Sequence, residues 1–201
     1  MLKKNMPRKA VVMLALAMGL SVGAVAPAAA ETSAPADSGT QVTSDVGTMA
    51  KTTRAAAIAR ARTWLTANGG RPIPYSMSKY FQGWRTDCSG YASMVWNVRT
   101  SGGSAVNHNT DSMLRGGYGT PGAVVKAISW DQIRQGDAIG KLGAGSLGSA
   151  GHVMIFDKWA NAAKTSYWVY EQASSSGGTA HRTHSKSYNG YKPYAYTNFS
   201  D

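Results

Sequence analysis

The spacing of apolar residues changes partway along the chain, near Gln135. Before this point, Thr53 to Thr66 and Cys88 to Val98 place their apolar residues at helical spacing, and a pair of glycines follows each segment. After it, glycine and serine clusters separate short β-rich runs, which are 137–142, 152–159, 167–172, 179–184 and 193–197. This order predicts an α+β domain, with N-terminal helices packed on an antiparallel sheet of about five to six strands.

The first 30 residues differ from the rest in composition. Four basic residues near the start precede the apolar stretch Val11 to Ala26, and three alanines ending at Ala30 follow it. This order is typical of a secretory signal peptide, so we expect cleavage near Ala30 and a secreted mature protein. The alternative is an uncleaved membrane anchor, but the apolar stretch is shorter than the roughly 20 residues that span a bilayer. We therefore expect no stable membrane anchor.

The remaining chain divides into a linker and one domain. Residues 31–50 are rich in serine, threonine, alanine and glycine and contain no aromatic residue, which predicts a flexible linker or short pro-segment. Residues 51–201 are enough for one domain with its own core. Within it, the stretch from residue 75 to Thr86 is expected to be irregular, and residues 101–122 are expected to form a long loop.

Basic residues outnumber acidic ones in the mature chain. The protein has 21 Lys and Arg and 10 Asp and Glu. Removing the four basic residues of the leader leaves 17 against 10, a net charge of +7. For an exported protein this favours an anionic cell-envelope polymer as partner, although the charge also serves solubility. No lysine and arginine stripe, recognition helix or zinc spacing is present, so we expect no nucleic-acid partner. We expect a monomer.

Cys88 is the only cysteine, so it cannot form an internal disulfide. In an exported chain, an odd thiol indicates a reactive role or a partner chain, whereas a buried, inert cysteine is the ordinary alternative. Cys88 stands at the start of a predicted helix, where free N–H groups and the helix dipole lower the pKa of a thiol. Asp87 or Thr86 can cap this helix, and Gly90 permits close approach of a substrate or strand.

A cysteine nucleophile needs a base within reach, and the chain contains four histidines. His152 is the strongest candidate, because it begins a β-rich run directly after a glycine and serine loop and follows the cysteine in the expected chain order. The other three lie in the predicted loop or in a later strand and are expected to be surface or packing residues; they are His108, His181 and His184.

A third polar group should orient the imidazole, and the next β-rich run supplies Glu171 and Gln172. In one hairpin register Glu171 pairs with Met154 and shares the face of His152. In the register shifted by one residue, Gln172 pairs directly with His152. We choose Glu171, because a carboxylate both fixes the tautomer and stabilises an imidazolium, and we keep Gln172 as the neutral alternative. An exposed acid at a strand end is the other interpretation of Glu171.

Several short motifs together resemble the NlpC-type papain-like cysteine peptidases of bacterial cell walls. They are Asp87-Cys88-Ser89-Gly90-Tyr91, Gln135-Gly136-Asp137, Gly151-His152-Val153 and the polar position that follows. The related CHAP amidases share the order Cys, His, Glu. The resemblance spans roughly residues 55–197 and implies a papain-like core that hydrolyses amide bonds in peptidoglycan. It also implies that Tyr75 helps to polarise the scissile carbonyl. We place Asp87 and Ser89 with Tyr75 as candidates for binding the oxyanion or the substrate.

The sequence departs from this family in two places. The stretch between Tyr75 and Asp87 lacks the usual double glycine, and aromatic residues crowd the C-terminal part. Such an aromatic wall would bind sugar rings or apolar acyl groups, although aromatic residues in short strands are more often core.

These features predict a secreted cysteine hydrolase of peptidoglycan stem peptides, either an endopeptidase or an amidase. Cys88 attacks as a thiolate, His152 carries the proton and Glu171 orients His152. We expect no metal and no cofactor, since there is no second cysteine and no cluster of histidine and aspartate ligands. One alternative is a non-catalytic protein that binds the cell envelope. Another is a thiol-dependent transacylase or inter-bacterial effector.

Overall fold

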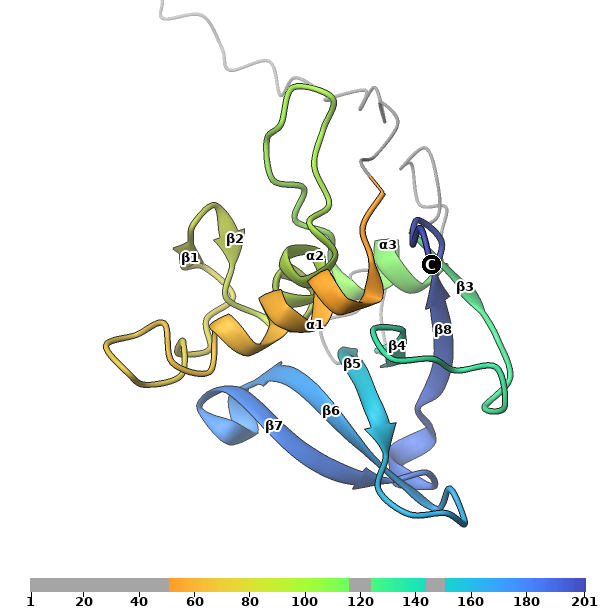
Figure 1. Ribbon diagram of the computed structural model, residues 1–201. Helices are drawn as coiled ribbons and strands as arrows, with labels where there is room; N and C mark the ends of the chain where they lie inside the picture. Colours follow the sequence, from red (N-terminus) through yellow and green to blue (C-terminus); the bar gives the residue numbers. More distant parts are fainter. Residues whose placement is uncertain (1–50, 116–123, 144–150) are drawn as a thin grey trace, which may run out of the picture. The chain divides into compact units, whose positions relative to one another are not determined.

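The computed structural model describes residues 51–115, 124–143 and 151–201 (Figure 1). The predicted signal peptide, residues 1–30, and the predicted linker, residues 31–50, lie outside the described residues. So does the end of the predicted loop, from residue 116 onward. No helix in the described part of the chain is both long and apolar enough to cross a bilayer.

Two helices lie where the apolar spacing predicts them, and both are shorter than predicted. Helix α1 spans Arg54–Thr63 and begins at Thr53, whose side chain accepts a hydrogen bond from the N–H of Ala56. Helix α2 spans Cys88–Trp96 and ends where Asn97 adopts a left-handed conformation, with φ of 56°. The left-handed residue explains why α2 stops before Val98.

The prediction of one long loop over residues 101–122 is wrong, because helix α3 spans Thr110–Arg115. Its start is marked by Asn109, whose side chain accepts a hydrogen bond from the N–H of Ser112 at 2.7 Å. A second small element interrupts the stretch expected to be irregular. There, strands β1 (Tyr80–Phe81) and β2 (Trp84–Arg85) form a short antiparallel hairpin.

A six-stranded antiparallel sheet forms the second layer, in the order β3-β8-β4-β5-β6-β7. The strands are β3 (Val125–Ala127), β4 (Ala138–Lys141), β5 (His152–Trp159), β6 (Ser166–Ala173), β7 (Gly178–Ser185) and β8 (Lys192–Tyr196). Two single-turn 3₁₀ helices, η1 (Ser174–Ser176) and η2 (Tyr188–Gly190), connect the later strands. The α+β class, with an antiparallel sheet of five to six strands, is confirmed.

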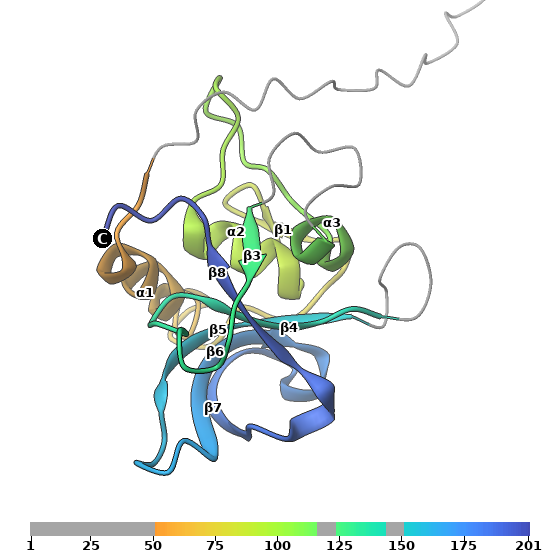
Figure 2. The same ribbon diagram turned by 90° about the vertical axis from the view of Figure 1, so that its right-hand side faces the viewer.

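The sheet has two buried faces, because its far side curls over a second core. Figure 2 shows the helices on one side of the sheet and strands β6 and β7 curving away on the other. Along β5, Val153 and Ile155 belong to the core shared with the helices, whereas Met154 and Phe156 belong to the second core. By strand alternation, His152 shares the face of Met154 and stands at the strand's beginning.

Candidate active site

The cysteine is held at the first position of α2 by a tightly fitted turn. The Asp87 carboxylate accepts a hydrogen bond from the N–H of Gly90 at 2.8 Å and pairs with Arg85 at 2.6 Å. A Cβ atom on Gly90 would lie 2.1 Å from the carbonyl oxygen of Arg85, so only glycine fits here. This turn fixes Cys88 at the N-terminal end of α2, where the first backbone N–H groups have no partner within the helix.

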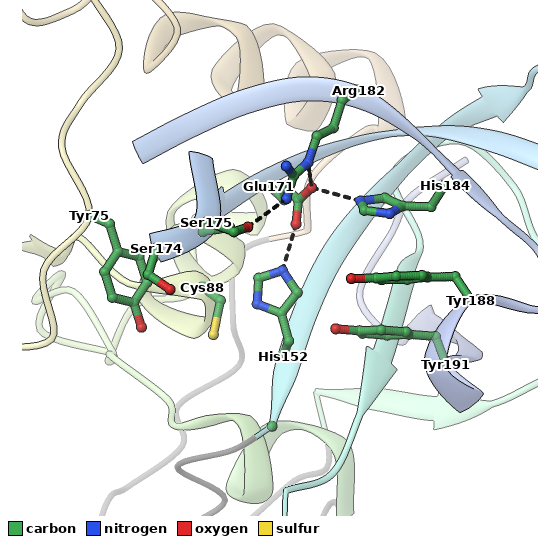
Figure 3. Close-up of a pocket in the computed structure, with 12 residues that line it drawn as sticks. Tyr75, Cys88, His152, Glu171, Ser174, Ser175, Arg182, His184, Tyr188 and Tyr191 are labelled. Atoms are coloured by element: carbon green, nitrogen blue, oxygen red, sulfur yellow. Dashed lines mark hydrogen bonds and ion pairs between the residues drawn. The ribbon is translucent and has the colours of Figure 1, made fainter. Parts of the chain in front are cut away.

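Cys88 opens onto a cavity of about 260 Å³ (Figure 3). Its wall contains four of the residues singled out in the sequence, which are Tyr75, Cys88, His152 and Glu171. The rest of the lining is Gly151, Ala173, Ser174, Ser175, Arg182, His184, Tyr188 and Tyr191. The side chains therefore come from the segment before β1, from α2, from β5 to β7, from the two 3₁₀ segments and from the residue that follows η2.

His152 bridges the thiol and the carboxylate. Its Nε2 lies 2.7 Å from Oε2 of Glu171, and its interaction with the Cys88 thiol raises the pKa of the imidazole. Figure 3 shows the other ring nitrogen turned toward the sulfur. The Oγ1 atom of Thr110, at the start of α3, lies 3.6 Å from the sulfur. This arrangement places a thiol, an imidazole and a carboxylate in one line of contacts.

The charges of this line favour ionised forms of both cysteine and histidine. Burial raises the pKa of the Cys88 thiol, but the hydrogen bond and charge of His152 outweigh it, so the net pKa is lowered. Burial lowers the pKa of His152, yet its contacts with Cys88 and Glu171 raise it to about 9. Both shifts run in the direction that favours a thiolate facing an imidazolium.

This pairing predicts the pH dependence of thiol reactivity. Because the pKa of Cys88 is lowered, the thiolate persists below the range of an ordinary cysteine, and alkylation by iodoacetamide should remain fast at pH 6. Replacing His152 with alanine removes the stabilising charge, and we expect the rate at pH 6 to fall about tenfold or more, equivalent to one pKa unit. Equal rates in the two proteins, measured by mass spectrometry of the labelled thiol, would contradict the ion pair.

Glu171 is 1% exposed, and every contact it makes favours its ionised form. Its Oε1 atom accepts hydrogen bonds from Nε of Arg182 and from Nε2 of His184, the latter at 2.8 Å. Burial alone would raise the pKa of this carboxyl, but the hydrogen bonds from His152, His184 and Arg182 hold it well below its usual range. Glu171 thus keeps its negative charge beside His152.

Strand register decides which of the two adjacent polar residues meets the imidazole. The pairs Ile155–Tyr170 and Phe156–Val169 belong to the register that places Glu171 on the face of His152. Beyond these pairs the register shifts, so that Lys158 pairs with Trp168. Because of this shift, counting residues from the hairpin turn does not give the pairing at the other end of the hairpin, where His152 and Glu171 lie.

Gln172 points away from His152 and is fully buried. Its Nε2 atom lies 3.1 Å from each of three carbonyl oxygens, those of Ile73, Pro74 and Thr86, to which its N–H groups donate. Its Oε1 accepts a hydrogen bond from Thr179 at 2.8 Å. The structure does not bring Gln172 to the imidazole. This side chain instead joins β6 to the segments that carry Tyr75 and Cys88.

The three residues expected to bind the oxyanion or substrate are placed differently from one another. Tyr75 lines the cavity, and burial, followed by the charge of Cys88, raises its pKa, so its hydroxyl retains a proton to donate. Asp87 caps α2, and the Ser89 hydroxyl contacts Arg85 at 3.1 Å. Neither of these two side chains lines the cavity.

Sequence reasoning missed several residues at the site. Arg182 was not singled out and His184 was expected to be a surface or packing residue, yet both contact Glu171. The alternation of β7 contained a signal, since Val169 pairs with Arg182 and Tyr167 with His184, on the face of Glu171. The other histidines lie elsewhere: His181 pairs with Asp157 at 3.0 Å, and His108 is buried beside Ser112.

The fold and the site together define an α+β protein with a cysteine, a histidine and a glutamate in contact within one cavity. Among the described residues, no group of three or more histidine, cysteine or acidic side chains is arranged to hold a metal ion. No family model matches the chain, and no curated protein matches it significantly.

Proposed function

We propose that the protein is a secreted cysteine hydrolase with a papain-like core, similar to the NlpC-type peptidases of bacterial cell walls. Its substrates are amide bonds in peptidoglycan stem peptides or in their link to the glycan. The observation that carries the proposal is the contact of one imidazole with both the Cys88 thiol and the Glu171 carboxylate, at the wall of an open cavity. Titratable groups with shifted pKa values that meet at a cavity are typical of functional sites.

In the proposed reaction, the Cys88 thiolate attacks the carbonyl carbon and the carbonyl oxygen becomes an oxyanion. N–H groups at the start of α2 and the Tyr75 hydroxyl stabilise this charge. The His152 imidazolium donates its proton to the leaving nitrogen as the C–N bond breaks, which leaves a thioester and a neutral imidazole. His152 then takes a proton from water, whose oxygen attacks the thioester carbon; the C–S bond breaks, which releases the acid and restores the Cys88 thiolate and the His152 imidazolium. Glu171 keeps the imidazole oriented throughout.

The cavity wall favours a polar substrate over an apolar acyl chain. Five hydroxyl-bearing side chains line it, which are Tyr75, Ser174, Ser175, Tyr188 and Tyr191. The Tyr188 and Tyr191 rings stack with centroids 5.5 Å apart, and His184 covers the other face of Tyr188 at 4.7 Å. Figure 3 shows the hydroxyl groups of Tyr188 and Tyr191 turned toward His152. Both faces of the Tyr188 ring are covered, so neither is left for stacking on a substrate.

Digestion of purified peptidoglycan tests the proposal. We expect the protein to release new amine termini, and mass spectrometry of the soluble products identifies whether the bond lies within the stem peptide or at the glycan. Protein whose thiol has been alkylated beforehand is the control and should release none. Rapid labelling of Cys88 without any peptidoglycan cleavage would contradict this substrate and favour a transacylase or effector acting on another acyl group.

A further inference from the structure

Four charged groups follow one another with alternating sign from the sulfur to the cavity rim. The Cys88 thiolate contacts the His152 imidazolium, which contacts the Glu171 carboxylate, which in turn contacts the Arg182 guanidinium. The first three are largely shielded from water, whereas the Arg182 side chain is 36% exposed. Glu171 therefore sits between two cationic partners that hold its two oxygens separately.

A carboxylate as deeply buried as Glu171 stays ionised only if donors and cations face it. His152 occupies Oε2, so Oε1 depends on Arg182 and His184. The other titratable groups that act on Glu171 are phenols on α2, on β6 and after η2, namely Tyr91, Tyr167 and Tyr191. Burial raises the pKa of each phenol, so all three remain uncharged near neutral pH. Arg182 thus supplies the guanidinium that faces Oε1 of Glu171.

Both supporting side chains are themselves held in place. The Nη2 atom of Arg182 donates to the Ser175 hydroxyl at 3.0 Å, so η1 fixes the far end of the guanidinium. The His184 ring stacks on Tyr188, with centroids 4.7 Å apart. These contacts leave the carboxylate of Glu171 little freedom to turn away from His152.

We propose that Arg182 and His184 are positioning residues that act through Glu171, keeping its carboxylate ionised and aligned on His152. This inference rests on the proposed function, since it assigns how the same site maintains its thiolate. Removing the guanidinium lets Glu171 take up a proton at higher pH. His152 then loses its anionic neighbour, and the thiolate it stabilises is lost with it.

The test compares Arg182→Met, which removes the cation, with Arg182→Lys, which retains it. The readouts are the pH profile of Cys88 alkylation by iodoacetamide and kcat and KM on purified peptidoglycan. For Arg182→Met we expect the acidic limb of the alkylation-rate profile to move to higher pH by about one unit or more. We also expect kcat at pH 7 to fall about tenfold with KM unchanged. Arg182→Lys should restore most of the kcat and the wild-type limb.

The matched control is His181→Gln, because His181 lies on the same strand but contacts Asp157 instead of Glu171. This variant should retain the wild-type profile. Thermal unfolding checks the fold of each protein. If Arg182→Met does not fold, His184→Phe and His184→Gln decide the question, since the amide keeps a donor for Glu171 and the phenyl ring does not. We expect a lower kcat for the first only, and equal effects would overturn the inference.

The outcomes separate this inference from the proposed function. Rapid alkylation of the wild type with a profile that Arg182→Met leaves unchanged would overturn the positioning role alone. Equal losses in Arg182→Met and Arg182→Lys, without any shift of the limb, would do the same. Slow alkylation of the wild type, unaltered by His152→Ala, would instead overturn the thiolate on which the proposed function depends.

Discussion

Cys88→Ser is expected to lower the rate of peptidoglycan amide hydrolysis by about 10⁴-fold or more, as removal of a nucleophile does in other acyl-transfer enzymes. The hydroxyl of serine has a far higher pKa than the Cys88 thiol, which contact with His152 lowers further. An imidazole that stabilises a thiolate therefore does not ionise the serine hydroxyl. The release of amine termini measures the loss.

Binding and stability provide the controls for this substitution. Serine keeps the small side chain beside Thr110, so thermal unfolding and sedimentation with insoluble peptidoglycan should match the wild type. Loss of hydrolysis with binding retained supports the enzyme. Unchanged hydrolysis would show that the thiol is not the nucleophile. Binding without hydrolysis in both proteins would favour a non-catalytic envelope-binding protein.

Gly90→Ala is expected to reduce the free energy of unfolding by about 4 kcal/mol or more, which is exceptional for one methyl group. The added Cβ would lie 2.1 Å from the carbonyl oxygen of Arg85 and 2.8 Å from its carbon. Both are backbone atoms of the turn that places Cys88, so no side-chain rotation relieves the clash. Urea unfolding followed by circular dichroism measures the effect.

Gly102→Ala is the matched control, because the nearest atom to its added Cβ is the Thr100 hydroxyl oxygen at 3.8 Å. A surface substitution of this kind changes the free energy of unfolding by only about 0.5 kcal/mol. If Gly90→Ala were as mild as Gly102→Ala, the close approach of α2 to Arg85 would be refuted. The position of Cys88 would then need another explanation.

Much of the fold was readable because long apolar patterns specify long elements. Strand β5 has the predicted bounds, 152–159, and α1 and α2 begin within one residue of the prediction. The elements that were missed are short. Helix α3 has six residues and β3 has three, too few to display a period, and their formation depends on contacts with distant segments.

The sequence predicted only those parts of the candidate site that depend on neighbouring residues in the chain. A cysteine at a helix start and a histidine at a strand start are local features, and the structure places Cys88 and His152 in contact. The choice between Glu171 and Gln172 depended on hairpin register, which an irregularity between Phe156 and Lys158 alters. Arg182 enters through a second hairpin, so its contact with Glu171 required two registers at once.

The buried amide of Gln172 ties β6 to the segments that carry Tyr75 and Cys88. Parting β6 from the segments of Pro74 and Thr86 would strand several carbonyl groups without donors, at a cost of about 1–3 kcal/mol for each one left unsatisfied. The junction between β6 and these two segments therefore resists separation. Entry is left to the rim of the cavity, where Tyr188 is 43% exposed while its ring stays stacked between His184 and Tyr191.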